Sequence, residues 1–255
     1  MSNDVDVQDR AVTYAQSLAE LQGAQKSSAG APAYSRFINR PLGRRFAAVG
    51  HVLGATPNQV TAVSALFTYT GIALIALLPP SWWSGLAVSA ALVVGYALDA
   101  ADGQLARLRG GGSLSGEWLD HVVDAGKISA LHLAVLIGAA RFTDLSMAWL
   151  LVPIAFTLVA NVTFFGMILN GLLRDRHHAR TGRPVERPRT SLLRSLLVIP
   201  TDYGLLCLVF LLLGAPMVFG AVYLVLLLCA AGFLSLALVK WYKDMSRLGT
   251  VGGQS

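Results

Sequence analysis

Four aspartates lie within one short stretch of the chain: Asp99, Asp102, Asp120 and Asp124. On helices, spacings of three and four residues place each pair on one face. The three glycines at 110–112 would reverse the chain between two antiparallel helices, so we expect all four carboxylates to converge. Oxygen ligands at this density suit hard cations, and they favour Mg²⁺ or Mn²⁺ over zinc.

Such a cluster predicts phosphate chemistry. In a two-metal site the ions lie about 3.5 to 4 Å apart and stabilise the attacking and leaving oxygens of an in-line displacement. The alternative is an ion- or proton-coupled membrane transporter, which also uses buried carboxylates. A transporter would not require small residues between the aspartates, at Gly103, Ala106 and Gly116, or the guanidinium of Arg107.

The composition indicates that lipid surrounds these helices. Hydrophobic residues make up 55% of the chain and charged residues 13%, whereas soluble domains carry roughly 25% charged residues. Crossing ~30 Å of hydrocarbon takes about 20 apolar residues as helix. Six stretches qualify, at residues 60–78, 83–106, 117–140, 147–173, 196–213 and 217–241. We therefore expect an all-α membrane protein with six transmembrane helices in one bundle.

The positions of Lys and Arg predict the orientation. They gather before the first apolar stretch, between the second and third, and after the fourth and sixth, whereas the opposite side has only Arg141. Positive charge marks cytoplasmic loops, so both termini and the aspartates should face the cytoplasm, in a bacterial or archaeal plasma membrane. The net charge of +6 then reflects topology and not nucleic-acid binding.

Four segments follow along the chain. Residues 1–32 are polar and expected to be partly disordered. Residues 33–55 mix apolar side chains with arginines, a pattern typical of an amphipathic helix at the membrane interface. Residues 56–245 form the six-helix membrane domain, and residues 246–255 form a C-terminal tail.

The aspartates belong to a longer pattern, D-x2-D-G-x2-A-R-x8-G-x3-D-x3-D, which runs from Asp99 to Asp124 with every fixed position filled. This pattern resembles the signature of the CDP-alcohol phosphotransferase family, class I. The resemblance implies six spans, an amphipathic helix before them, and a homodimer. The stretch Thr56 to Thr61 looks like a segment that many members carry beside the nucleotide. Residues 35–41 look similar to members that make inositol-phosphate diesters.

The resemblance also implies roles for the aspartates. Asp99, Asp102 and Asp120 would hold two metal ions. Asp124 would join them and act as general base, taking the proton of an acceptor hydroxyl that attacks the β-phosphorus while CMP leaves. A base must lie within hydrogen-bond reach of that hydroxyl and stay ionised, which neighbouring cations favour.

Further residues are implied to contact substrates. Small residues at Gly103, Ala106 and Gly116 would let the nucleotide approach the helices. Arg107 would pair with phosphate charge, and Asn58 and Thr61 would be weaker nucleotide contacts.

The acceptor side is left with alternatives. Lys127 could bind an anionic acceptor or form a structural ion pair with an aspartate. Arg174 and Arg176 could bind an acceptor phosphate or serve only as topological anchors. The donor stays open between CDP-diacylglycerol and a CDP-linked small alcohol. The acceptors of the family include inositol phosphate, glycerol phosphate, serine and diacylglycerol, and membrane lipid is an expected partner.

Overall fold

The computed structural model describes residues 13–23, 32–182 and 202–251. Every regular element in these ranges is helical, so the expected all-α class is confirmed. The elements are α1 (Tyr14–Gly23), the π-helix η1 (Ser35–Asn39), α2 (Arg40–Val52), α3 (Pro57–Leu77), α4 (Trp82–Leu108), α5 (Leu114–Phe142), α6 (Met147–Thr181), α8 (Tyr203–Val209), the 3-10 helix η3 (Phe210–Gly214) and α9 (Pro216–Val251).

Five of these helices, α3, α4, α5, α6 and α9, are long and apolar enough to cross a membrane. The stretch expected to form the fifth span, residues 196–213, lies partly outside the described residues. Its described part continues through α8 and η3 as a shorter apolar helix, Tyr203–Gly214. The count of six spans therefore stays a prediction.

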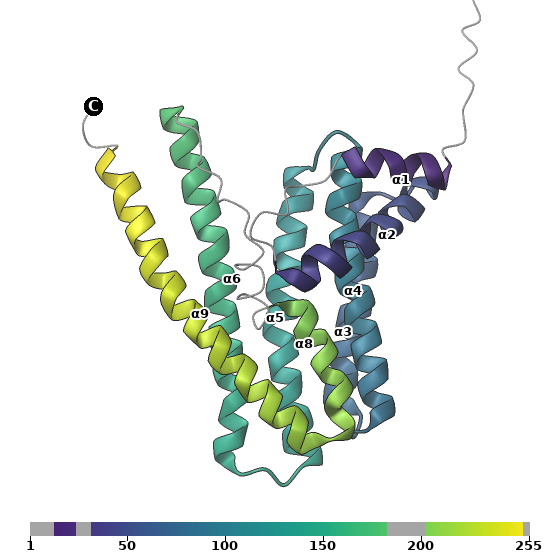
Figure 1. Ribbon diagram of the computed structural model, residues 1–255, viewed down its shortest axis with the longest axis vertical. Coiled ribbons are helices and arrows are strands. Elements are labelled where there is room, and N and C mark those ends of the chain that lie inside the picture. The colour runs from purple at the N-terminus through teal and green to yellow at the C-terminus, as the bar shows by residue number, and fades with distance from the viewer. Residues whose placement is uncertain (1–12, 24–31, 183–201, 252–255) are drawn as a thin grey trace, which may run out of the picture.

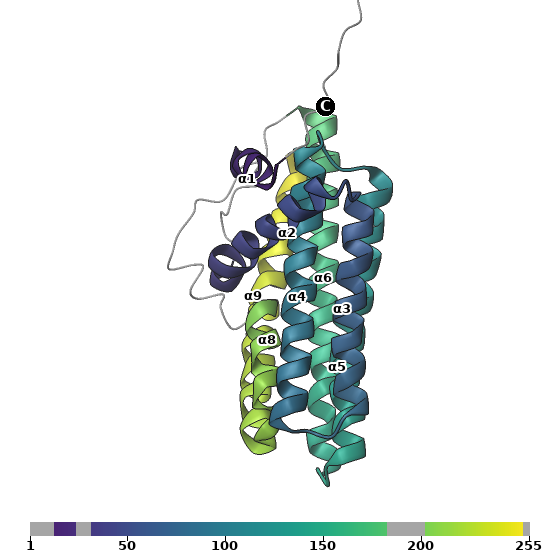
Figure 2. The ribbon, with the colours of Figure 1, turned by 90° about the vertical axis from the view of Figure 1, so that its right-hand side faces the viewer.

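The long helices form a bundle whose one end is crossed by two short helices. Helices α3, α4 and α5 run side by side, whereas α9 starts at the end of η3 and runs diagonally across α6 (Figures 1 and 2). Helices α1 and α2 lie across the end of α4, and both contact it (Figure 2). The amphipathic segment expected at residues 33–55 thus contains η1 and α2.

Local signals set the reversal between α4 and α5. Gly110 and Gly111 have φ angles of 92° and 128°, which residues with a side chain adopt only with strain. The hydroxyl of Ser113 then accepts a hydrogen bond from the Gly116 amide at 3.0 Å and caps α5. This cap and turn place α5 antiparallel to α4, as the glycine run predicts.

The bundle has two apolar cores. The larger core lies in the half of the bundle away from α1, and it is formed by side chains of α3, α4, α5, α6, α8, η3 and α9. Leu92, Leu131 and Phe210 are buried in it. The smaller lies at the other end, where Leu21 of α1 is fully buried against α2 and α4. The Ser17 hydroxyl and the His51 ring share a hydrogen bond of 2.9 Å there. Helix α1 is therefore a packed element within the polar N-terminal segment.

Helices α6 and α9 splay away from α3, α4 and α5 toward the end of the bundle where α1 lies (Figure 1). At 35 and 36 residues they are more than ~50 Å long at 1.5 Å per residue, against ~30 Å of hydrocarbon. Arg174 on α6 pairs with Asp244 on α9 at 2.5 Å and ties the two helices together there.

Asp202 connects two segments that are distant in sequence. Its carboxylate accepts hydrogen bonds from the Gly204 amide at 3.0 Å, which caps α8, and from the Ser35 amide at 3.2 Å, at the start of η1. The side chain is buried. Because a buried donor that loses its acceptor costs about 1 to 3 kcal/mol, Asp202 should hold η1 and the following α2 against the bundle.

We therefore expect Asp202→Ala to lower the unfolding free energy by about 1 to 3 kcal/mol. The measurement is thermal unfolding of the purified protein in detergent, followed by circular dichroism. Asp144→Ala is the matched control, since Asp144 is exposed in the loop between α5 and α6. Equal melting temperatures for the two variants would contradict the proposed role of Asp202.

Candidate active site

Three of the four aspartates meet between α4 and α5. One carboxylate oxygen each from Asp99, Asp120 and Asp124 lies within 4.8 Å of the others, and all three residues are half-buried. A site made only of carboxylate oxygens matches the ligand preference of Mg²⁺ and Mn²⁺. These residues therefore fit a divalent metal site, and they would be its protein ligands.

Asp102 lies beside this group and has a different partner. It is 7% exposed, and its carboxylate accepts a hydrogen bond of 2.6 Å from the Thr61 hydroxyl on α3. Thr61, expected as a nucleotide contact, is thus a partner of an aspartate. The structure places three carboxylates in one group, with Asp102 held next to them by α3.

Lys127 pairs with two of the clustered aspartates. Its ammonium lies 2.5 Å from Asp99 and 3.1 Å from Asp124, and the residue is 5% exposed. Charges at membrane depth require partners, and these two carboxylates supply them. The structural ion pair, one of the two alternatives for Lys127, is present, and it also orients Asp124.

A polar pocket of about 200 Å³ opens beside the carboxylates. Its lining residues are Arg40, Asp99, Ala100, Asp102, Gly103, Gln104, Arg107 and Asp120. A side chain at Gly103 would project into free space, with the nearest atom, Nη1 of Arg107, 3.4 Å from its Cβ. A pocket lined by both carboxylates and arginines suits a cation and a phosphate side by side.

Some expected substrate contacts lie outside this pocket. Asn58 and Gly116 lie next to each other, since a Cβ on Gly116 would lie 3.1 Å from the Asn58 side-chain oxygen. Ala106 is half-buried on α4. Arg174 is paired with Asp244, and Arg176 is exposed near the end of α6. The structure does not bring either of these arginines to the polar pocket.

A larger cavity lies one helical turn deeper in the bundle. Its volume is about 500 Å³, and its walls come from α4, α5, α6, α8 and α9. Ile128, which lines it, follows Asp124 by four residues on α5, and Tyr96 precedes Asp99 by three on α4. Most of the lining is apolar. The buried Tyr203 hydroxyl has no hydrogen-bond partner among the described residues other than the nearby thiol of Cys207.

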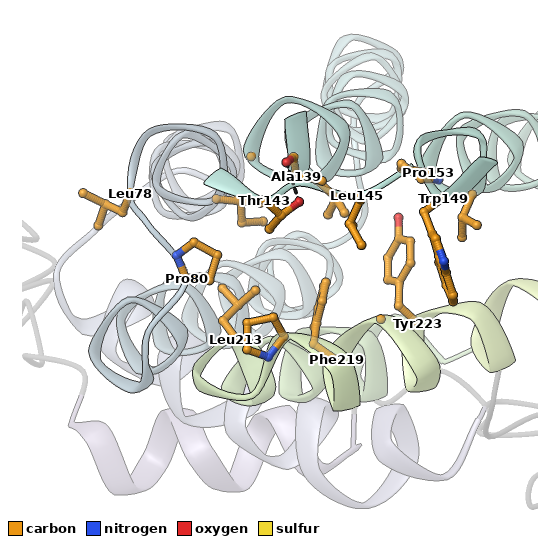
Figure 3. Close-up of a pocket in the computed structure, with 16 residues that line it drawn as sticks. Leu78, Pro80, Ala139, Thr143, Leu145, Trp149, Pro153, Leu213, Phe219 and Tyr223 are labelled. Carbon is orange, nitrogen blue, oxygen red and sulfur yellow. Dashed lines mark hydrogen bonds between the residues drawn. The ribbon is translucent and has the colours of Figure 1, made fainter. Parts of the chain in front are cut away.

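A third pocket lies at the opposite end of the bundle and holds none of the aspartates. It measures about 90 Å³, and Pro80, Trp149 and Tyr223 are among its walls (Figure 3). The Tyr223 hydroxyl shares a 2.6 Å hydrogen bond with His132, which lines the deeper cavity. This buried pair therefore separates the small pocket from the deeper cavity, and the small pocket is no part of the site.

Sequence reasoning missed three residues of the polar pocket, Arg40, Ala100 and Gln104. The charge pattern places Arg40 among the arginines that indicate topology, and Gln104 occupies a variable position of the signature. The small residues at Gly43 and Ala47, on the same side of α2 as Arg40, were the signal available for a close approach to α4.

Comparisons with known proteins give the family. A family model described as CDP-alcohol phosphatidyltransferase matches residues 54–236. A search of curated proteins found no match. The fold is similar to the crystal structure of Mycobacterium tuberculosis phosphatidylinositol phosphate synthase in complex with manganese and citrate, at 20% identity and a TM-score of 0.49, covering 80% of this chain and 89% of that one. Since the family match spans most of its length, the chain belongs to the CDP-alcohol phosphatidyltransferase family.

Proposed function

We propose that this membrane transferase moves a phosphatidyl group from CDP-diacylglycerol to an acceptor hydroxyl and releases CMP. Family membership places it in phospholipid biosynthesis and gives the transporter alternative no support. One observation supports the choice of donor. The aspartates lie between a polar pocket of about 200 Å³ and a deeper, mostly apolar cavity of about 500 Å³.

A lipid-linked donor would use both spaces. Its diphosphate would lie in the polar pocket, near Arg107 and the carboxylates, and part of its acyl chains would enter the deeper cavity past Ile128. Each buried methylene group contributes about 0.8 kcal/mol, so even part of one chain would contribute substantially to binding. A CDP-linked small alcohol would leave the deeper cavity without a role.

The residues suggest how the proton moves. Asp124 would accept the proton of the acceptor hydroxyl as that oxygen forms its bond to the β-phosphorus. The bond from the β-phosphorus to the oxygen shared with the α-phosphate breaks, and CMP takes that oxygen away. A divalent ion held by Asp99, Asp120 and Asp124 would stabilise charge on the attacking and leaving oxygens. Lys127, paired with Asp124, would keep that carboxylate turned toward the site.

We place the polar pocket on the cytoplasmic side. The pocket lies at the end of the bundle crossed by α2, which carries four arginines with the residues just before it. Arg141, at the other end, donates a hydrogen bond to the backbone oxygen of Ala76. A soluble CMP product could then leave into the cytoplasm. The homodimer implied by the family resemblance stays a prediction.

The test is CMP release by the purified protein in detergent with Mg²⁺ or Mn²⁺. CDP-diacylglycerol and water-soluble CDP-alcohols are each offered with inositol phosphate, glycerol phosphate, serine and diacylglycerol. We expect CMP only with CDP-diacylglycerol and one class of acceptor. CMP formed only from a water-soluble CDP-alcohol would refute the lipid donor.

Removal of the metal gives a further expected result. Excess EDTA should abolish CMP release, because Asp99, Asp120 and Asp124 would then have no cation to hold against the phosphates. Added Mg²⁺ or Mn²⁺ should restore it. Activity that persists in EDTA would contradict the metal role of the cluster.

A further inference from the structure

We propose that Arg40 of the interfacial helix forms, together with Arg107, a site for a substrate phosphate, so that α2 completes the active site from outside the bundle. Both arginines line the polar pocket that also holds Asp99, Asp102 and Asp120. The inference rests on the proposed function and adds a binding residue that lies outside the aspartate signature.

The backbone of Arg40 is fixed against α4. Its carbonyl oxygen accepts a hydrogen bond of 3.1 Å from the side-chain amide of Gln104, which is 2% exposed. Gln104 lies two residues beyond Asp102 on α4. The start of α2 is therefore tied directly to the helix that carries two of the aspartates.

Close packing of the two helices supports this placement. A Cβ on Gly43 would lie 2.8 Å from the Cβ of Ala100 and 2.9 Å from the backbone oxygen of Ala97. Only glycine allows this approach. Residues three apart lie on the same face of a helix, so the face of α2 that carries Gly43 also carries Arg40 toward the pocket.

The segment before Arg40 has an unusual backbone. Residues Ser35–Asn39 form a π-helix that leads directly into α2, and π-helical turns within helices are frequent at functional sites. The Ser35 amide at its start is held by the carboxylate of Asp202, and Asn39 at its end is buried. Arg40 is thus held from both directions along the chain, which reduces the entropy lost when it binds a ligand.

The charges indicate what the pair binds. Arg40 and Arg107 line the same pocket, so their like charges repel each other, and an anion between them would relieve that repulsion. A planar guanidinium can donate two parallel hydrogen bonds to phosphate oxygens. The carboxylates of the same pocket would repel an anion unless a cation lies between, as in a metal-bound phosphate. The occupant is therefore a phosphate of either the donor diphosphate or a phosphorylated acceptor.

The test compares Arg40→Gln with Arg45→Gln in the full-length protein. Arg45 lies on the same helix but is exposed and does not line the pocket. Each protein is titrated with CDP in the presence of Mn²⁺, and KM is measured for donor and acceptor. Hydrogen bonds to charged groups are stronger than those between neutral groups. We therefore expect Arg40→Gln to weaken CDP affinity or raise a KM by about tenfold to a hundredfold, and Arg45→Gln to change neither.

CDP affinity and the two KM values together distinguish a phosphate of the donor from a phosphate of the acceptor. Weaker CDP binding in Arg40→Gln assigns the site to the donor diphosphate. Unchanged CDP binding with a raised KM for a phosphorylated acceptor assigns it to the acceptor. If neither changes, the inference is overturned. If wild-type protein releases no CMP from any substrate pair while Arg40→Gln still loses CDP affinity, the proposed function fails and the phosphate site stands.

A second variant guards against misfolding. Gly43→Ala keeps the charge of Arg40 but forces α2 away from Ala97 and Ala100. It should weaken binding of the same ligand that Arg40→Gln affects. Arg40→Lys keeps the positive charge but loses the planar guanidinium group. Its affinity for this ligand should lie between those of wild type and Arg40→Gln. Wild-type ligand affinity in both Gly43→Ala and Arg40→Lys would also overturn the inference.

Discussion

Asp124→Asn protein should fold and bind Mn²⁺ weakly, yet release CMP about a hundredfold to ten-thousandfold more slowly than wild type. The amide cannot accept the proton of the acceptor hydroxyl. Folding should survive because Lys127 keeps Asp99, the nearer of its two carboxylate partners, at 2.5 Å. The measurements are kcat for CMP release and the melting temperature of each protein.

Glu117→Gln is the matched control for this prediction. Glu117 lies two turns before Asp124 on the same helix, and its carboxylate, with 64% of its side chain exposed, is 4.0 Å from His121. Loss of this negative charge should leave kcat within about twofold, as for an exposed ion pair. A wild-type rate in Asp124→Asn would exclude Asp124 as the base and leave it a metal ligand at most.

The part of the site that could be predicted is the part that the chain encodes locally. Asp99 and Asp102 share one helix, and Asp120 and Asp124 share the next, so helical spacing alone gives their common faces. The glycines at 110 and 111 supply a turn that few other residues allow. Three of these four carboxylates indeed meet across the turn.

The departures come from contacts between distant segments. Asp102 is drawn aside by Thr61, 41 residues earlier in the chain. Arg40 reaches the pocket because Gly43 allows α2 to pack on Ala97 and Ala100. The small residues of α2 indicate a close approach, but they do not say which helix lies against them. Charge patterning correctly identifies arginines at one end of a membrane bundle, but it cannot separate an arginine that anchors the helix from one that lines a pocket.

The same limit applies to elements outside the apolar stretches. Helix α1 lies in the polar segment that the sequence predicts to be partly disordered, and isolated helices of its length are marginal in water. It is held by burial of Leu21 against α2 and α4 and by the hydrogen bond between Ser17 and His51. Tertiary packing thus supplies the stability that its own sequence does not.

The second large effect is expected for Asp99→Asn, because Asp99 takes part in three interactions. It contributes an oxygen to the carboxylate group, lines the polar pocket and pairs with Lys127. Asp99→Asn leaves two carboxylates in the cluster while the positive charge of Lys127 stays in place. A divalent cation should therefore bind far more weakly. We expect CMP release to fall by more than about a thousandfold, as several kcal/mol of charge stabilisation are lost.

Two readouts distinguish this outcome from simple misfolding. Mn²⁺ binding, followed by electron paramagnetic resonance of the free ion, should weaken sharply in Asp99→Asn and stay at the wild-type level in Glu117→Gln. The melting temperature of Asp99→Asn should fall, since the buried ammonium of Lys127 then relies on Asp124 alone at 3.1 Å. Wild-type Mn²⁺ affinity in a folded Asp99→Asn protein would show that the cation lies elsewhere. Asp99 would then act in this site only as the partner of Lys127.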